Sequence, residues 1–144
     1  MASTLALGLC AAAILAKLQV SAPVLALVPV ARIGADVSPR PLYPYVLVEG
    51  GGEVSLNTMG RPDQPKFGSF ARVQVRAVSQ VPGEAEVSAI VNAIKAELDG
   101  QPLIVAGYAS AGVTFETLIP LKDTVNGLVT REWVAEFEVT VSQS

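Results

Sequence analysis

The sequence contains no histidine and a single cysteine, Cys10. Histidine is the commonest general base and the commonest metal ligand in proteins, and it activates many serine and cysteine nucleophiles. One cysteine cannot form an intrachain disulfide or supply the thiolates of a structural zinc site. We therefore expect no enzyme of the usual nucleophilic or metal-dependent kinds, no cofactor and no metal site.

Charged residues are also scarce, at 16% of the 144 residues, whereas hydrophobic residues make up 51%. An average soluble domain carries about 25% charged residues. The formal net charge is −3 and the ten Lys and Arg are scattered, so a surface that grips nucleic acid through its phosphates is not expected. The surplus of apolar side chains indicates that a partner covers part of the surface.

The apolar stretch of residues 5–28 suggests a secretory signal or a membrane span at first sight. No basic residue precedes it and Lys17 interrupts it, which argues against a signal peptide. Apolar side chains instead recur with helical spacing at Leu7, Ala11, Ile14, Leu15 and Leu18. We predict a helix that ends near Val20, with Pro23 opening a short second turn and Cys10 as a buried small side chain.

Two segments alternate strictly between apolar and polar side chains, residues 70–79 and residues 128–142, so each is predicted to be a strand with one buried face. The polar faces carry Arg72 and Arg76 on the first strand and Glu132, Glu136 and Glu138 on the second. We predict that the two strands are antiparallel neighbours with opposite charges facing each other. Trp133 and Val129, on the apolar face of the second strand, are expected in the core, with a subunit interface as the alternative place for the aromatic Trp133.

The remaining elements are less regular in pattern. We predict a helix over residues 84–100, strands or strand pieces over residues 32–33, 45–49, 103–108 and 113–119, and loops over residues 50–68 and 120–127. Small residues at 109–112 are expected to interrupt the strand pieces. The element order predicts one α+β domain over residues 1–144, with an antiparallel or mixed sheet, two main helices packed on one face, and long loops.

Two sequence features that suggest chemistry have simpler explanations. The run Gly50-Gly51-Gly52 lacks the lysine and the Ser/Thr of a phosphate-binding loop at the required spacing. Glu136 and Glu138 share one strand face, as paired catalytic carboxylates can, but a solvated strand face is the usual explanation for such a pair.

Several short stretches, in this order, are similar to one known family. They are residues 25–28 closing on Arg32-Ile33, residues 43–48, residues 71–77 running into residues 84–100, and residues 133–141. In this layout the chain resembles the tail-terminator, or tail-completion, family of long-tailed bacteriophages. The resemblance covers nearly the whole chain but includes no sequence that aligns with residues 50–67.

The resemblance implies a structural virion protein and not an enzyme. Members form a ring, usually of six copies, which caps the tail tube after it has reached its set length and presents a surface to the head connector. The implied partners are further copies of the chain, the tail tube protein and a head-completion or connector protein, while DNA passes through the lumen without specific binding. The implied location is the head–tail junction of the virion, after assembly in the host cytoplasm, with no membrane involved.

Two other functions remain open at this point. One is a different neck protein of the same virion, such as a head-completion subunit, which would share the size, acidity and ring symmetry. The other is an exported envelope or ligand-binding protein whose first helix is a signal.

The two predicted long loops are candidates for contacts with neighbouring subunits or with the tube, because long loops often become ordered on assembly. The candidate interface residues are Leu56, Met59, Arg61, Lys66 and Phe67 in the first loop and Leu121, Lys122, Asp123 and Asn126 in the second.

We predict that deletion of residues 58–64 leaves the fold intact and abolishes assembly. The far-UV circular dichroism spectrum and melting curve of the purified variant should match those of the parent, while tails carrying the variant should not be completed. Unchanged assembly would reject a role for this loop.

Overall fold

The computed structural model describes residues 6–36, 41–56, 68–125 and 127–142. The elements in chain order are α1 (Ala6–Gln19), α2 (Ala22–Leu25), a 3-10 turn (Val30–Arg32), β1 (Ile33–Gly34), β2 (Tyr45–Leu56), β3 (Gly68–Ser79), α3 (Ala85–Leu98), β4 (Ser110–Val125) and β5 (Leu128–Ser142). The strands form one mixed sheet in the order β1-β2-β3-β5-β4, with only β1 and β2 parallel.

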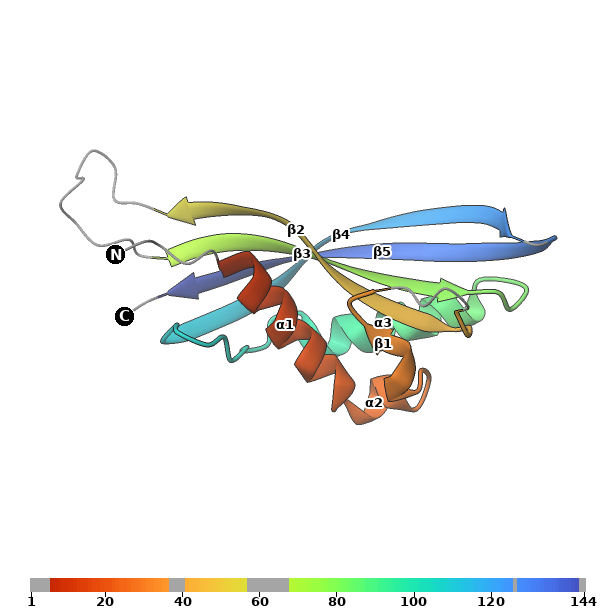
Figure 1. Ribbon diagram of the computed structural model, residues 1–144, viewed down its shortest axis with the longest axis horizontal. Coiled ribbons are helices and arrows are strands. Elements are labelled where there is room, and N and C mark those ends of the chain that lie inside the picture. Colours follow the sequence, from red (N-terminus) through yellow and green to blue (C-terminus); the bar gives the residue numbers. More distant parts are fainter. Residues whose placement is uncertain (1–5, 37–40, 57–67, 126, 143–144) are drawn as a thin grey trace.

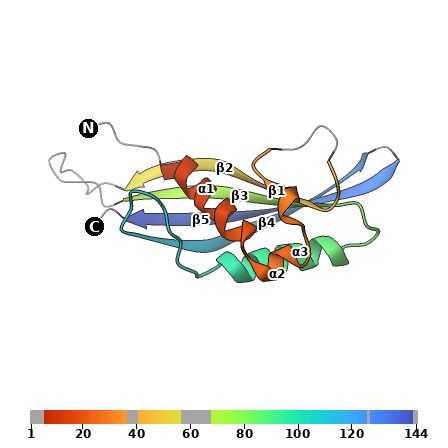
Figure 2. The same ribbon diagram turned by 60° about the horizontal axis from the view of Figure 1, so that its bottom comes forward.

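The helices of the described residues, α1, α2 and α3, all lie on one face of the sheet, and none of them covers the other face (Figure 1). The turned view shows α1 crossing over β2 and β3, with α3 beside it (Figure 2). This arrangement confirms the predicted α+β class with two main helices on one face. Among the described residues no helix combines the length and the apolar character that crossing a bilayer requires.

The core lies between the two main helices and the sheet. Ile14 and Leu18 of α1, which packs on β2 and β3, and Ile94 of α3, which packs on β3 and β5, are completely or almost completely buried. Phe137 of β5 is fully buried and meets Phe115 of β4 edge to face, with ring centroids 5.7 Å apart. Cys10 is buried in the same core, as predicted for a small apolar side chain.

The predicted pairing of the two alternating strands is confirmed. β3 and β5 run antiparallel through an unbroken register from Gly68↔Ser142 to Ser79↔Arg131. Arg72 lies opposite Glu138, so unlike charges face each other on the polar side while apolar residues share the helix side. The first helix ends at Gln19, and Pro23 lies in the first turn of α2, also as predicted.

The prediction of a loop over residues 50–68 is wrong for its first part, because β2 continues to Leu56. The glycines lie inside the strand at a register shift between Gly50 and Gly52. A Cβ atom on Gly51 would lie 3.3 Å from the carbonyl oxygen of Arg72, and Gly52 has a φ of +154°. Glycine is common where a bulge brings two backbones close together, so the glycines permit the bulge without ending the strand.

The predictions for the segments on either side of residues 109–119 are also wrong. Residues 103–108 form no strand, and only an isolated bridge joins Pro102 to Gly112. Residues 109–112 do not interrupt a strand, because β4 begins at Ser110 and continues through the predicted loop to Val125. Pro120 does not end β4, because β4 is an edge strand and an edge strand tolerates proline where the missing N–H points outward.

Two side chains expected in the core are more exposed than predicted. Trp133 packs against the core but is only partly buried, and Val129 is 38% exposed. Both lie on the helix side of β5, near the end where β3 stops opposite Arg131. At this end, β5 therefore extends beyond its neighbour β3 and beyond the helices that cover the core.

Replacing Phe137 with alanine should lower the free energy of unfolding by about 3–5 kcal/mol, because the substitution leaves a cavity at a fully buried site. Urea denaturation measures this change. Leu42, which is 65% exposed, is the matched control, and Leu42→Ala should change the unfolding free energy by no more than about 0.5 kcal/mol. Equal effects at the two sites would contradict the assigned core.

Candidate assembly surface

The uncovered side of the sheet, which we call the open face, carries the side chains that alternate with the core. Leu47 of β2, Arg76 of β3, Val134 of β5 and Ile119 of β4 lie side by side in one row across it. Leu47 and Val134 are buried although no helix covers them, whereas Ile119 is 40% exposed. The apolar residues of this row are therefore buried on β2 and β5 and exposed on β4.

Arg76 covers the buried part of this row. Its Nη1 donates a hydrogen bond to Glu132 Oε1 over 2.6 Å, and its Nε lies 2.8 Å from Glu49 Oε1. The second contact is a charge pair and not an aligned hydrogen bond, because the Nε donor has no acceptor in line with it. An arginine stem between two apolar neighbours shields them while its charged head stays near water.

The same network affects the acid–base properties of its members. The hydrogen bond to Glu132 raises the pKa of Arg76 above its ordinary value, so this guanidinium stays charged. Desolvation by burial, followed by the effects of Tyr43 and Glu132, raises the pKa of Tyr45. The Tyr43 and Tyr45 rings lie 5.4 Å apart beside the network. Both changes fit an ordered polar layer over Leu47 and Val134.

An acidic patch lies farther along the open face, where β4 has a bulge between Phe115 and Thr117. We define the patch as Glu116, Glu136 and Glu138. A hydrogen bond shared with Glu116, followed by desolvation and the charge of Glu116, raises the pKa of Glu138, and Arg72 opposes the shift. The patch therefore contains carboxylates that repel one another and that a single arginine only partly neutralises.

The outer edge of β4 is covered at one end and free at the other. Gly100 N–H donates to the Val113 carbonyl over 2.8 Å, and the Phe115 N–H donates to Asp99 Oδ1 over 2.9 Å. After the bulge, Leu118, Pro120 and Lys122 lie opposite alternate residues of β5. In an antiparallel pair, every second residue points its backbone polar groups away from the partner strand. Phe115, opposite Phe137, points its N–H outward to Asp99, and the backbone groups of Leu118, Pro120 and Lys122, which lie opposite the following alternate residues of β5, therefore also point outward. Beyond Pro120 this edge is unpaired among the described residues.

The free end of β4 and the start of β5 project from the sheet as a two-stranded arm, residues 122–125 and 128–131. β3 ends opposite Arg131, so only β4 pairs with the remainder of β5. Figure 1 shows this hairpin at the opposite end of the sheet from the carboxyl ends of β2 and β5. Gly127, with a φ of +79°, forms part of its tight turn.

Apolar side chains are exposed on the open-face side of this arm and its base. Ile119, Leu121 and Leu128 are 40%, 45% and 53% exposed, respectively. Lys122 and Arg131 lie directly opposite each other on the other side. Within the described part of the chain, the ion pairs found involve Arg76 and neither of these two cations.

The predicted interface residues are only partly described. Leu56 is the last residue of β2. Leu121, Lys122 and Asp123 lie in β4 and not in a loop, with Lys122 and Asp123 inside the arm. Met59, Arg61, Lys66, Phe67 and Asn126 lie outside the described residues, as does the segment 58–64. Arg131 and Glu116 were not recognised in the sequence, because their positions depend on strand register and on the bulge.

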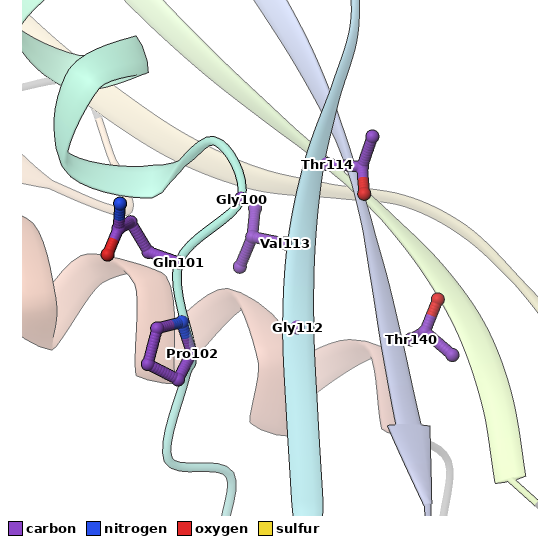
Figure 3. A pocket seen from close by; sticks show the side chains of 7 residues that line it. All are labelled: Gly100, Gln101, Pro102, Gly112, Val113, Thr114 and Thr140. Atoms are coloured by element: carbon purple, nitrogen blue, oxygen red, sulfur yellow. The ribbon is translucent and has the colours of Figure 1, made fainter.

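A shallow groove of about 430 Å³ lies beside the covered end of β4 and is lined by Gly100, Gln101, Pro102, Gly112, Val113, Thr114 and Thr140 (Figure 3). The groove is lined by no ionisable side chain. Among the described residues no cluster of three or more Cys, Asp or Glu side chains is arranged to hold a metal ion. The polar side chains that line the groove are those of Gln101, Thr114 and Thr140.

Comparisons with known proteins identify related sequences and folds. A family model described as "Tail completion protein gp17" matches residues 12–141. No curated protein matches the sequence significantly. A chain from a solved structure titled "Virion of native gene transfer agent (GTA) particle" is 21% identical, with a TM-score of 0.73, and the match covers 97% of this chain and 99% of that one. A second solved chain is 14% identical, with a TM-score of 0.60 and 94% coverage of each chain.

Replacing Glu138 with glutamine should make the stability less dependent on pH. A carboxyl pKa raised in the folded state contributes stability below the unfolded value of about 4.3, and this contribution is lost as the pH rises through the folded pKa. Glu138→Gln should therefore melt up to a few degrees above the parent at neutral pH, and the advantage should vanish near pH 4.

Melting curves across this pH range measure the effect, with Glu116→Gln as the reference background. Once Glu116 is neutral, the further change at Glu138 should have a much smaller pH-dependent effect. An undiminished effect in that background would show that Glu116 is not the cause.

Proposed function

The chain belongs to the tail completion protein gp17 family, and from this premise we propose that it forms a ring that caps the tail tube, ends tube polymerisation and joins the tail to the head connector. Membership makes it a structural component of the virion tail and confirms the resemblance seen in the sequence. A structural family of this kind indicates a non-enzymatic role. The ring, its six copies and the termination step are the proposed part.

The observation that carries the proposal is an open sheet with two different free edges. β1 covers only Val46 and Leu47 on the outer edge of β2, and beyond Leu47 no described strand pairs with that edge. The other free edge is the end of β4 beyond Pro120. Two dissimilar surfaces on one subunit suit head-to-tail contacts, and such contacts between identical subunits generate a ring when the rotation closes.

The distribution of charge supports passage of DNA without specific binding. The net charge is −3, and on the open face Arg76 is paired with Glu49 and Glu132. Arg72, the second arginine of that face, lies opposite Glu138. Binding DNA through its phosphates requires cations that are available to the phosphates, and these two guanidinium groups already face carboxylates.

The exposed apolar residues support contacts with other virion proteins. Leu121, Lys122 and Asp123 adjoin or lie in the projecting arm, so the interface predicted around them remains our proposal, now on a strand pair. We propose that the partners are further copies of the chain, the tube protein and a head-completion or connector protein. The likeness to a chain of a gene transfer agent virion supports this, because a protein of the same fold occurs in a virion particle.

An early stop codon in the gene should produce overlong tails without heads, because a tube without its cap continues to polymerise. Negative-stain microscopy of the lysate measures the tail lengths, and expression of the gene from a plasmid provides the control. Tails of normal length that fail to join heads would indicate another neck protein. Normal particles would overturn the proposed function.

A further inference from the structure

The two-stranded arm receives little support from the rest of its own subunit. An isolated pair of strands is at best marginally stable in water, and this pair lacks β3 on one side. Leu121 and Leu128 are each about half exposed on its open-face side. A surface of this kind is usually covered by a partner in the working assembly.

The opposite side of the arm carries an unfavourable pair of like charges. Lys122 and Arg131 are direct cross-strand neighbours, and like charges in that position destabilise a strand pair. Neither cation belongs to the ion pairs found among the described residues. An acidic partner surface would relieve this repulsion.

The chain itself has a surface of the required sign. The acidic patch of Glu116, Glu136 and Glu138 lies on the open face beside a single arginine, Arg72. The arm of the same copy cannot reach it, because Lys122 is six residues along β4, or roughly 20 Å, from Glu116. In addition, Lys122 and Arg131 lie on the helix side of the sheet, whereas the patch lies on the open face.

We propose that the arm of each copy docks on the open face of the next copy, with Lys122 and Arg131 above Glu116 and Glu138 of that neighbour. This inference rests on the proposed ring and specifies its subunit contact. One such contact relieves both sets of like charges. Ile119 and Leu121 of the receiving copy lie on the same open face as that copy's acidic patch, whereas Leu121 and Leu128 of the docking arm point to the opposite side of the arm. The contact is heterologous, as a closed ring of identical subunits requires.

A charge-swap experiment tests the contact. Variant A carries Lys122→Glu and Arg131→Glu, and variant B carries Glu116→Lys and Glu138→Lys. Each variant alone places like charges at every subunit contact, whereas a mixture places opposite charges wherever A and B alternate. In a strain that lacks the gene, either variant alone should give about a hundredfold fewer normal-length tails, and co-expression should restore them.

Asp36→Lys with Glu84→Lys is the matched control for variant B, since it makes the same change in net charge at exposed positions that belong to neither the arm nor the patch. This control should support normal tails. Circular dichroism melting of purified A and B should show that both fold. The arm contact would be overturned by normal tails with A or B alone, or by folded A and B that fail to restore tails when co-expressed. The arm would then be assigned to a contact with the tube protein or the connector protein.

A second measurement needs no substitution. Carbodiimide treatment of assembled tails that contain isotopically light and heavy subunits should join Lys122 to Glu116 or Glu138 of a different copy. Absence of such mixed cross-links would also overturn the contact. The stop-codon experiment separates the two proposals, because overlong tails without the gene would uphold the ring function even if the arm contact failed.

Discussion

The antiparallel pairing of β3 with β5 is the interaction on which the other parts of the structure depend. Its unbroken register places Val73 beside Phe137 on the side that receives the helices, and it simultaneously places Arg72 beside Glu138 on the other side. A slip of one residue would exchange the two sides along the whole strand pair. The core and the charged open face are therefore two results of a single register.

Periodicity predicted this part of the fold well, since alternation with a period of two depends only on neighbouring residues in one strand. It failed where the outcome depends on position in the sheet. Glycines at residues 50–52 and Pro120 are turn or loop signals in a sequence. In the sheet the glycines lie in the part of β2 that β1 does not cover, and Pro120 lies in the edge strand β4, where a bulge or a missing donor is tolerated. Edge position is a tertiary property, and so these strand extensions were not predictable from local pattern.

The same distinction applies to the candidate site. Lys122 was selected from the sequence because it lies in an apparent loop, whereas the structure places it in a strand opposite Arg131. The bulge at Glu116 brings this residue to Glu138, which is far from it in the sequence. Around Arg76, Glu49 of β2 and Glu132 of β5 meet although they are still farther apart in the sequence. The residue types were visible in the sequence, but their neighbours were not.

Pro120 affects how free subunits behave before they are incorporated into a tail. The edge beyond the bulge offers backbone groups to any extended chain, and unprotected edges of this kind seed aggregation. Proline withholds one donor in the middle of that edge, and the neighbouring Lys122 adds a charge, so an incoming strand meets a gap in the hydrogen-bond ladder. Subunits that accumulate in a crowded cell before tails are finished would thus be protected against indiscriminate sheet growth.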